Sequence, residues 1–286
     1  MQIGIFLFTT IMNLKIAIQG IKGSFHHQVA NRYFGDAISL DECNSFNDVV
    51  KSLKTAHSDK GVMALENSIA GSILPNYALI DKNELYIIGE YYLDIHMNLM
   101  ALKGQTIQDI KEVHSHPIAL LQCEVFFNQF PHIKLVESID TAETAYRIQK
   151  QNLLGIGAVA APIAAEMYDL EILASGIHTI KSNKTRFVIV KTKKKELDKE
   201  EINKASFKFE LDDTPGSLAT VLNVMNNCKL NLTKIQSLPI IETPFQYAFF
   251  VDVVFEKYKH YEKAKKLLEI MTTHFKVLGE YKQGKQ

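Results

Sequence analysis

The 286-residue chain has no excess of either charge, because lysine plus arginine and aspartate plus glutamate each number 32. A neutral chain has no general attraction to nucleic acid or to an anionic membrane, so an anionic ligand must be held by local features. Cysteine is scarce as well: Cys43, Cys123 and Cys228 are odd in number and widely spaced. They form no disulfide or metal-ligand pattern, which predicts reduced thiols in a cytoplasmic protein.

The start of the chain lacks the features of a targeting segment. Residues 1–12 are apolar but contain no lysine or arginine, and no small-residue cleavage site precedes the first strand. The run is also too short to span a bilayer. We therefore expect neither a signal peptide nor a membrane anchor, and translation could start at Met1 or at Met12.

Short apolar stretches alternate with helix signals over the first two thirds of the chain. Strands are predicted at residues 14–18, 62–65, 112–114, 133–137 and 156–160. Ser45, Asp140 and prolines 75, 117 and 162 are typical of first helical turns. This alternation predicts an α/β fold with a mostly parallel sheet covered on both faces. The extended segment 85–102 and the strand after Thr185 fit two crossings between two lobes, with a cleft between the lobes.

Polar residues gather where these predicted strands end, at Ser24, Glu66 to Ser72, Ser115 and Thr141. In open α/β sheets, ligands bind beyond the carboxyl ends of the strands, where the N-termini of helices point. This gathering favours a binding cleft at those strand ends.

The pentapeptide Asn183-Lys184-Thr185-Arg186-Phe187 brings an amide, a hydroxyl and a guanidinium to the start of an apolar strand. Arg186 could clamp a planar carboxylate through two hydrogen bonds, and Thr185 could donate a hydrogen bond or a proton. The alternative is an ordinary polar strand start, with Arg186 in a surface ion pair. The pentapeptide by itself leaves both interpretations open.

The composition changes sharply at residues 191–204, which are rich in lysine and glutamate and predict a solvated connector. Beyond it, strands are predicted at 206–211, 231–237, 247–255 and 275–281, with helices after Pro215-Gly216 and at 261–274. This βαββαβ order is typical of a ferredoxin-like unit. We therefore expect one domain over residues 13–192 and a second over residues 203–286.

Three further patterns suggest other ligands, but each favours a structural role. The glycines at 155 and 157 lie inside an apolar strand rather than in the turn of a nucleotide-binding motif. His114 and His116 would share one strand face, but no further histidine or cysteine completes a zinc site. The aromatic residues at 249, 250 and 255 favour sheet core or a dimer surface over base stacking. We expect no metal, no cofactor and no nucleic acid.

Several motifs, taken in order along the chain, resemble one known family. They are Gly20 to Phe25, Glu66-Asn67-Ser68, Ser115-His116-Pro117 with Gln122-Cys123, Asp140-Thr141-Ala142 and Asn183 to Phe187. They are similar to the motifs of monofunctional prephenate dehydratase with a C-terminal ACT domain, although Ile21 stands where proline is usual. The resemblance covers the chain from about residue 15 onward.

The resemblance implies a two-lobed, periplasmic-binding-protein-like catalytic domain followed by a ferredoxin-like ACT domain. It also implies the decarboxylative dehydration of prephenate to phenylpyruvate, water and CO2 in phenylalanine biosynthesis, without metal, flavin or nucleotide. Thr185 is then expected to act as direct or relayed proton donor to the leaving hydroxyl. Glu66 is the second candidate acid and would have to be buried to stay protonated.

The other site residues that the resemblance implies fall into two groups. Asn67, Ser115 and Gln122 are expected to assist catalysis by positioning the substrate. The remaining residues, expected to bind the substrate, are Ser24, Ser68, Thr141, Asn183, Arg186 and Phe187. Arg186 would hold a substrate carboxylate or brace the loop.

The C-terminal part resembles the effector-binding motifs of ACT domains, in which case Pro215, Gly216, Ser217, Leu218, Asn231 and Leu232 would bind an amino acid such as L-phenylalanine. The next motif reads Gln236-Ser237-Leu238-Pro239 where the family shows Glu-Ser-Arg-Pro. Losing arginine removes a guanidinium and all its donors. Phenylalanine binding through backbone groups, a shifted specificity and a loss of regulation all stay open.

By analogy with ACT domains, which usually pair, a homodimer or homotetramer is expected. Two alternatives to prephenate dehydratase stay open: an arogenate dehydratase, and a catalytically silent module that binds an amino acid or another solute. The intact Glu66-Asn67-Ser68 and Thr185-Arg186-Phe187 motifs argue against the silent module.

Overall fold

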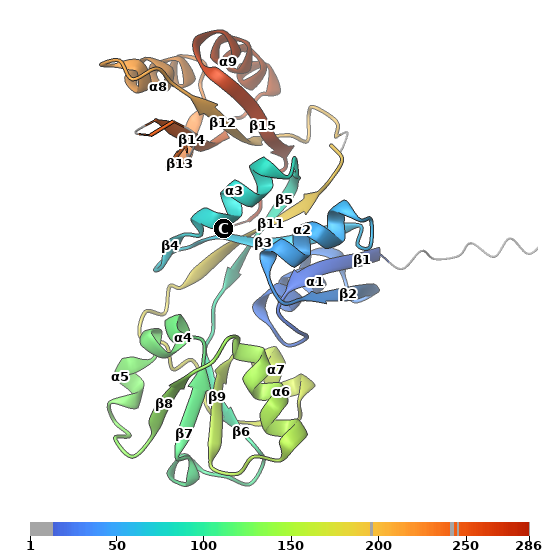
Figure 1. Ribbon diagram of the computed structural model, residues 1–286, viewed down its shortest axis with the longest axis vertical. Coiled ribbons are helices and arrows are strands. Elements are labelled where there is room, and N and C mark those ends of the chain that lie inside the picture. Colours follow the sequence, from blue (N-terminus) through green and yellow to red (C-terminus); the bar gives the residue numbers. More distant parts are fainter. Residues whose placement is uncertain (1–13, 195–196, 241–242, 245, 286) are drawn as a thin grey trace, which may run out of the picture.

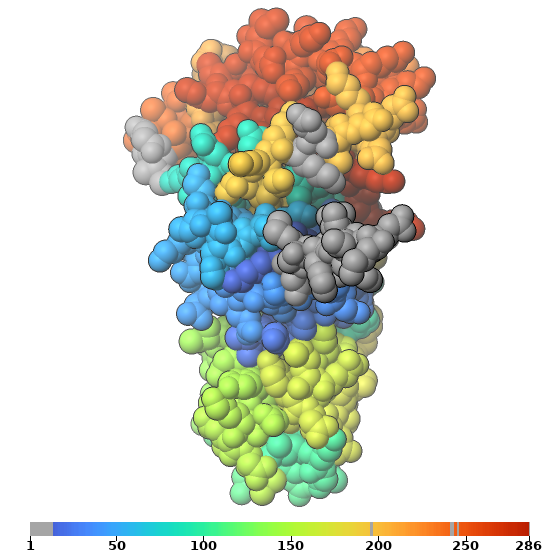
Figure 2. Space-filling model, turned by 90° about the vertical axis from the view of Figure 1, so that its right-hand side faces the viewer, coloured from blue at the N-terminus to red at the C-terminus, as the bar shows by residue number. Residues whose placement is uncertain are grey.

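The computed structural model describes residues 14–285 except 195–196, 241–242 and 245, so the alternative starts Met1 and Met12 lie outside the described residues. Three parts follow one another along the long axis of the molecule (Figure 1). We call them the second lobe at one end, the first lobe in the middle and the C-terminal unit at the other end. Figure 2 shows the same stacking in space-filling form, with the blue first lobe between the green second lobe and the red C-terminal unit.

The first lobe is built on a sheet with the order β2-β1-β3-β11-β5. Its strands are β1 Leu14–Gln19, β2 Ile38–Cys43, β3 Lys60–Asn67, β5 Tyr86–Asp94 and β11 Lys184–Lys191, and the two-residue β4 Gly71–Ser72 pairs with β3. Its helices are α1 Phe25–Phe34, α2 Phe46–Lys54 and α3 Leu74–Lys82. A mostly parallel sheet was predicted. The strands β2, β1 and β3 are parallel, but β11 runs antiparallel to both of its neighbours, so the sheet is mixed.

The second lobe has its own sheet, with the order β10-β6-β9-β7-β8. Its strands are β6 Asn98–Ala101, β7 Glu112–Ser115, β8 Lys134–Glu137, β9 Ile156–Ala160 and β10 Glu171–Ala174. Its helices are η1 Ile107–Asp109, α4 Pro117–Gln122, α5 Glu124–Phe127, α6 Thr141–Gln151 and α7 Pro162–Met167. Both lobes thus place polar helix starts after buried strands, the arrangement that positions a cleft between them.

Two segments cross between the lobes. The first, residues 95–97, joins β5 to β6 inside the stretch predicted to cross. The second, residues 175–183, joins β10 to β11 and lies before Thr185, whereas we expected it in the strand after Thr185. That prediction is wrong because β11 is a central strand of the first lobe, paired along its length with β3 and β5. Thr185 therefore lies directly at the point where the chain re-enters the first lobe.

The C-terminal unit has the predicted βαββαβ order. Its elements are β12 Lys204–Glu210, α8 Ser217–Asn227, β13 Asn231–Pro239, β14 Tyr247–Val254, α9 Tyr258–Met271 and β15 Thr273–Tyr281. The strands form an antiparallel sheet in the order β13-β14-β12-β15. Element boundaries differ from the prediction by up to three residues: α9 starts at Tyr258 and ends at Met271, so His274, expected in the helix, lies in β15.

The sheets of the first lobe and the C-terminal unit meet edge to edge, where β15 pairs with β5 at Gly279 and Ile87. A side chain at Gly279 would place its Cβ only 2.4 Å from the carbonyl oxygen of Ile87, so the contact requires glycine. The result is one 10-stranded sheet that runs through both parts (Figure 1). The C-terminal unit is therefore joined to the first lobe through backbone pairing as well as side chains.

Candidate active site

A cleft of about 820 Å³ lies between the two lobes. Its described lining comes from the starts of α1, α2, α3 and α6, the turn between β3 and β4, the first crossing, α4 and β11. Among the predicted site residues, those that line it are Ser24, Asn67, Gln122, Thr141, Thr185 and Phe187. Residues separated by more than a hundred positions in the sequence thus share one cavity.

The hydroxyl of Thr185 is held by the side chain of Asn67. Asn67 Oδ1 accepts the backbone N–H groups of Ile69 at 3.0 Å and Ala70 at 2.8 Å, so its Nδ2 must face the opposite way. That Nδ2 donates to Thr185 Oγ1 over 2.9 Å. Because Thr185 Oγ1 is an acceptor in this bond, its own proton is left to donate, and it has no acceptor within the described part of the chain. The geometry presents Thr185 to the cleft as a donor.

Asn183 extends this network across the cleft. Its Oδ1 accepts from Asn67 Nδ2 over 2.7 Å, and its own Nδ2 donates to Gln122 Oε1 over 2.9 Å. Asn183 is 1% exposed and is not among the lining residues, whereas Gln122 belongs to α4 of the second lobe. The chain of amides therefore links the two lobes, and it uses Gln122 through its Oε1 and not through its Nε2.

Two predicted binding residues lie at helix starts on the cleft wall. Ser24 caps α1, where its Oγ accepts the N–H of His27 over 3.2 Å. Thr141 begins α6, which is capped by Asp140 through the N–H groups of Ala142 and Glu143. The first turns of helices carry unpaired N–H groups and a partial positive charge, which favour carboxylates. No lysine or arginine occurs among the described lining residues, so these neutral donors would have to hold an anion.

The apolar wall of the cleft contains a histidine that the sequence pattern did not single out as a site residue. His26 packs edge-on against Phe187, with ring centroids 5.0 Å apart, and against Phe46 at 5.4 Å. Burial lowers the pKa of His26 to about 3, so its ring is neutral in the ordinary working range. Its Nε2 is buried without a hydrogen-bond partner in the described structure. The sequence could have indicated that His26 lines the cleft, because it lies in the first turn of α1, two residues after Ser24.

The structure contradicts the prediction that Arg186 binds the substrate. Its side chain is 3% exposed and points away from the cleft, with Nε 2.7 Å from Glu90 Oε2 and Nη1 2.5 Å from Asp252 Oδ2. Its Nη2 donates to the hydroxyl of Tyr281. Successive residues of a strand face opposite sides, so Thr185 toward the cleft sends Arg186 to the other face. Neither the substrate clamp nor the surface ion pair is correct, because the pair is buried.

The predictions for Glu66, Ser68 and Ser115 also need correction. Glu66 is half-buried and outside the cleft lining, with its Oε1 2.5 Å from Lys234 Nζ. This ion pair occupies the carboxylate that was expected to serve as the second candidate acid, and it lies outside the cleft. Ser68 is exposed and bonds to Ser182 and Lys184. Ser115 is fully buried, and its hydroxyl donates to the carbonyl of Val159 over 2.6 Å, so it is not free to bind a substrate.

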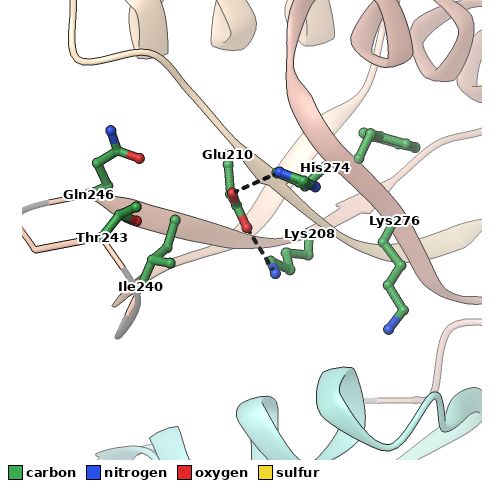
Figure 3. Close-up of a pocket in the computed structure, with 8 residues that line it drawn as sticks. Lys208, Glu210, Ile240, Thr243, Gln246, His274 and Lys276 are labelled. Atoms are coloured by element: carbon green, nitrogen blue, oxygen red, sulfur yellow. Dashed lines mark ion pairs between the residues drawn. The ribbon is translucent and has the colours of Figure 1, made fainter.

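The predicted effector residues lie in two separate segments of the C-terminal unit. Pro215, Gly216, Ser217 and Leu218 form the start of α8, and Asn231 and Leu232 begin β13. Within one chain the segments line different pockets, since Ser217 and Leu218 border a cavity of about 150 Å³ and Asn231 borders another of about 560 Å³. A third pocket, of about 590 Å³, lies between β12 and β15 near α3, and its described lining includes none of these residues (Figure 3).

The described residues contain no group of three or more histidine, cysteine, aspartate or glutamate side chains that could hold a metal ion. In the same part of the chain, no helix is both long and apolar enough to cross a membrane.

Comparison with known families decides the affiliation of the chain. Residues 16–195 match the family model described as prephenate dehydratase. The chain belongs to the prephenate dehydratase family. The matched range contains both lobes and every lining residue of the cleft. The cleft therefore lies within the part of the chain that matches the family.

Curated relatives of the family agree over nearly the whole chain. The prephenate dehydratase of Methanocaldococcus jannaschii is 34% identical over 276 residues, which cover 94% of this chain and 98% of the relative. An Arabidopsis thaliana protein named arogenate dehydratase/prephenate dehydratase 2, chloroplastic, is 33% identical over 94% of this chain and 72% of its own length. The similarity therefore includes the C-terminal unit.

Solved structures of similar fold are more distant in sequence. The prephenate dehydratase of Arthrobacter aurescens, solved in complex with L-Phe, superposes with a TM-score of 0.85 at 24% identity and covers 94% of this chain and 90% of its own. GqqA, described as a novel type of quorum quenching acylase, gives a TM-score of 0.84, also at 24% identity, and covers 94% of this chain and 98% of its own. These structures show the mixed α/β fold. Because one fold hosts several activities, they do not identify the reaction of this chain.

Proposed function

We propose that this member of the prephenate dehydratase family converts prephenate to phenylpyruvate, water and CO2, with Thr185 as the proton donor. The observation that carries the proposal is the hydroxyl of Thr185, which accepts from Asn67 and keeps its own proton for the cleft. In this reaction the ring carboxylate leaves as CO2, its bonding electrons enter the ring, and the ring hydroxyl leaves as water after it gains a proton. The ring becomes aromatic, so no oxidant or reductant is consumed.

The walls of the cleft suit the two ends of such a substrate. Phe46, Phe187 and Met97 give an apolar surface for a six-membered ring, the amide of Asn67 lies beside Thr185, and Gln122 lines the same cavity. A hydroxyl that must leave the ring would lie against this polar group. One positioned acid accelerates such a step by about 10²–10⁴-fold. The positioning of the reacting groups supplies much of the remaining rate acceleration.

Binding of the substrate's carboxylates would fall to neutral donors. The starts of α1 at Ser24 and α6 at Thr141 face the cleft from opposite lobes. Dipoles fixed in this way hold a carboxylate without a lysine or arginine beside it. This arrangement fits decarboxylation, since a carboxylate that becomes neutral CO2 loses any ion pair it had made in the ground state.

A second candidate substrate is arogenate, in which an amino acid replaces the keto acid of the side chain. The observation that favours it is Asp140, the carboxylate among the described lining residues, which could pair with an ammonium group. Asp140 also caps α6 through its Oδ1. Substitution Asp140→Asn keeps an N-cap residue and removes the charge. It should reduce turnover of arogenate more than turnover of prephenate if arogenate is the natural substrate.

We also propose finer features of the organisation. Residues 13–192 would form the catalytic domain, of the periplasmic-binding-protein-like type, and residues 203–286 an ACT domain, as the antiparallel β13-β14-β12-β15 order supports. Phenylalanine would bind at Pro215–Leu218 of one chain and at Asn231 and Leu232 of a second chain in a homodimer or homotetramer. The separation of these segments within one chain supports a shared site. The three buried free cysteines fit a cytoplasmic location.

The test is turnover of prephenate by the purified full-length chain, followed by phenylpyruvate formation with and without phenylalanine. Wild-type protein should turn over prephenate, Thr185→Ala should lose about 10²–10⁴-fold in kcat, and Thr185→Ser should retain part of the activity. A folded wild-type protein without turnover of prephenate or arogenate would contradict the proposal. Near-normal turnover by a folded Thr185→Ala variant would contradict the role of Thr185.

A further inference from the structure

The C-terminal unit reaches the rim of the cleft through one lysine. Lys234, in β13, places its Nζ 2.5 Å from Glu66 Oε1 and 2.6 Å from Ser72 Oγ. Its side chain is only 14% exposed, and that of Glu66 is 33% exposed. Hydrogen bonds that involve a charged partner are shorter and stronger than neutral ones, most of all when solvent is limited. The contact is therefore a defined clamp between the C-terminal unit and the first lobe.

The two residues that Lys234 grips lie opposite each other in one hairpin. Glu66 in β3 pairs with Ser72 in β4, and Asn67 pairs with Gly71. The turn of this hairpin forms part of the cleft wall, because Asn67, Ala70, Gly71 and Ser72 line the cavity. Lys234 therefore contacts both strands of the hairpin, and a displacement of Lys234 would displace both.

This hairpin also sets the hydrogen bond that prepares Thr185. Asn67 follows Glu66 directly, and its Oδ1 accepts the N–H groups of Ile69 and Ala70 within the turn. The turn thereby aims Asn67 Nδ2 at Thr185 Oγ1. A change in the hairpin would rotate or displace that amide, and displacements of about 1 Å in an active site can cost about 10²-fold in rate.

The strand that carries Lys234 has a local irregularity beside it. The pairing of β13 with β14 shifts register between Leu232 and Lys234, where Leu232 pairs with Val253 and Lys234 with Asp252. Such bulges bend a strand and re-aim its side chains. Asn231 and Leu232, the proposed effector residues, precede Lys234 on the same strand. A ligand that straightened or tightened this end of β13 would move Lys234 relative to the hairpin.

We propose that Lys234 is a positioning residue of the active site: the C-terminal unit completes the cleft by clamping the β3–β4 hairpin, and effector binding is transmitted through this clamp to Asn67 and Thr185. This inference rests on the proposed function for its kinetic consequence. The clamp itself rests only on the contacts to Glu66 and Ser72.

A second lysine of the C-terminal unit provides a matched control. Lys208, in β12, also crosses to the first lobe, with its Nζ 3.0 Å from Asp81 Oδ2 in α3, and its side chain is 17% exposed. Asp81 is not among the lining residues of the cleft. Lys208 lies in the pocket that faces α3, beside Glu210 (Figure 3). Lys208→Met and Lys234→Met each remove one interdomain lysine, but only the second removes a contact to the hairpin.

The experiment compares Lys234→Met, Lys234→Arg and Lys208→Met in the full chain by steady-state kinetics on prephenate and by thermal unfolding. We expect Lys234→Met to lower kcat/KM by about tenfold or more, Lys234→Arg to recover part of this loss, and Lys208→Met to stay within about twofold of wild type. If phenylalanine inhibits the wild type, Lys234→Met should weaken the inhibition. Equal kcat/KM in Lys234→Met and Lys208→Met would overturn the proposal.

Hydrogen exchange gives a readout that needs no activity. The amides of residues 67–72 should exchange faster in Lys234→Met than in wild type, and Lys208→Met should leave their rates unchanged. If Lys234→Met does not fold, Lys234→Gln is measured in the same way. Unchanged exchange in this hairpin would contradict the clamp even in an active protein. An inactive wild type whose hairpin loosens in Lys234→Met would instead contradict only the proposed function.

Discussion

Two neighbouring residues, Thr185 and Arg186, face two different regions of the molecule. Thr185 faces the cleft, whose described lining contains no lysine or arginine, and where some donors are left for a ligand. Arg186 faces the charged seam between the first lobe and the C-terminal unit, which consists of Glu90, Arg186, Lys204, Ser206, Asp252 and Tyr281. Under the proposed function, one family motif therefore serves substrate chemistry through Thr185 and attachment of the C-terminal unit through Arg186.

The two regions differ in positive charge: the seam contains Arg186 and Lys204, and the described lining of the cleft contains no lysine or arginine. In the seam, burial alone would raise the pKa of Asp252, but the charges of Arg186 and Lys204 and the hydrogen bond from Ser206 outweigh burial and hold it below its usual value. A buried charge is tolerated when its partners are fixed. In the cleft, a fixed lysine or arginine would stabilise a substrate carboxylate before it leaves. From this comparison we propose that the buried charges hold the C-terminal unit to the first lobe and that the neutral donors of the cleft are left for the substrate.

The largest expected effect in the seam comes from Arg186→Met. The substitution leaves Glu90 and Asp252 buried with one partner fewer, and breaking a buried pair typically costs about 3–5 kcal/mol in the free energy of unfolding. Denaturant unfolding of wild type and variant measures this loss. A loss below about 1 kcal/mol, the usual range of a surface pair, would contradict a structural role for the seam.

His26 gives the cleft wall a dependence on pH. Its pKa in the folded chain, about 3, lies below the ordinary value of 6.5, so the unfolded chain binds more protons between these values. Stability is therefore full above pH 6.5 and falls as the pH falls toward 3. At pH 4.5, two units below 6.5, the loss from this residue is at most about 2.7 kcal/mol.

Thermal unfolding of wild type and His26→Asn between pH 7.5 and 4.5 measures this dependence. The pKa values of His27 and His178 are also lowered by burial, so both proteins should lose stability on acidification. The wild type should lose more than His26→Asn. If the unfolding temperature fell equally with pH in both proteins, His26 would not be buried in its neutral form.

Asn67→Ala tests the preparation of Thr185. The change removes the donor that holds Thr185 Oγ1 and the acceptor that holds the turn at Ile69 and Ala70. We expect kcat to fall by about 10–100-fold, because the amide acts through Thr185 and does not replace it. Steady-state kinetics on prephenate checks this. A rise in KM with kcat unchanged would assign Asn67 to substrate binding instead.

The smallest effect on activity is expected for Ser115→Ala. This variant distinguishes a structural role of Ser115 from the catalytic role expected from the sequence. The buried hydroxyl donates to Val159, so its loss should cost about 0.5–1.5 kcal/mol of stability. The values of kcat and KM should stay near those of wild type, because Ser115 does not line the cleft. A loss of kcat without a loss of stability would restore the catalytic role that the sequence suggested.

The sequence predicted the parts of the fold that depend on local patterns. Alternating strands and helices, the first crossing and the βαββαβ order follow from periodicity and capping residues such as Ser45 and Asp140. The edge strand β2 was missed because its residues 39, 41 and 42 are polar. The second crossing was misplaced because periodicity does not say to which lobe β11 belongs.

The site was predicted less completely, because side-chain partners far apart in the sequence decide it. Arg186 was assigned to the substrate since its partners, Glu90 and Asp252, lie 96 and 66 positions away. Ser115 was assigned to catalysis since nothing local shows that Val159 takes its hydrogen bond. The residues placed correctly in the cleft, such as Ser24 and Thr141, sit at helix starts that the sequence does reveal.

The most direct test of the different roles of Thr185 and Arg186 measures both activity and stability for the variants Thr185→Ala and Arg186→Met. We predict that Thr185→Ala loses about 10²–10⁴-fold in kcat on prephenate and unfolds close to the wild-type temperature. Arg186→Met should unfold at a clearly lower temperature, and its folded fraction should retain a kcat within about tenfold of wild type. The opposite pattern, with activity lost in stable Arg186→Met and retained in Thr185→Ala, would contradict the assignment of chemistry to one residue and attachment to the next.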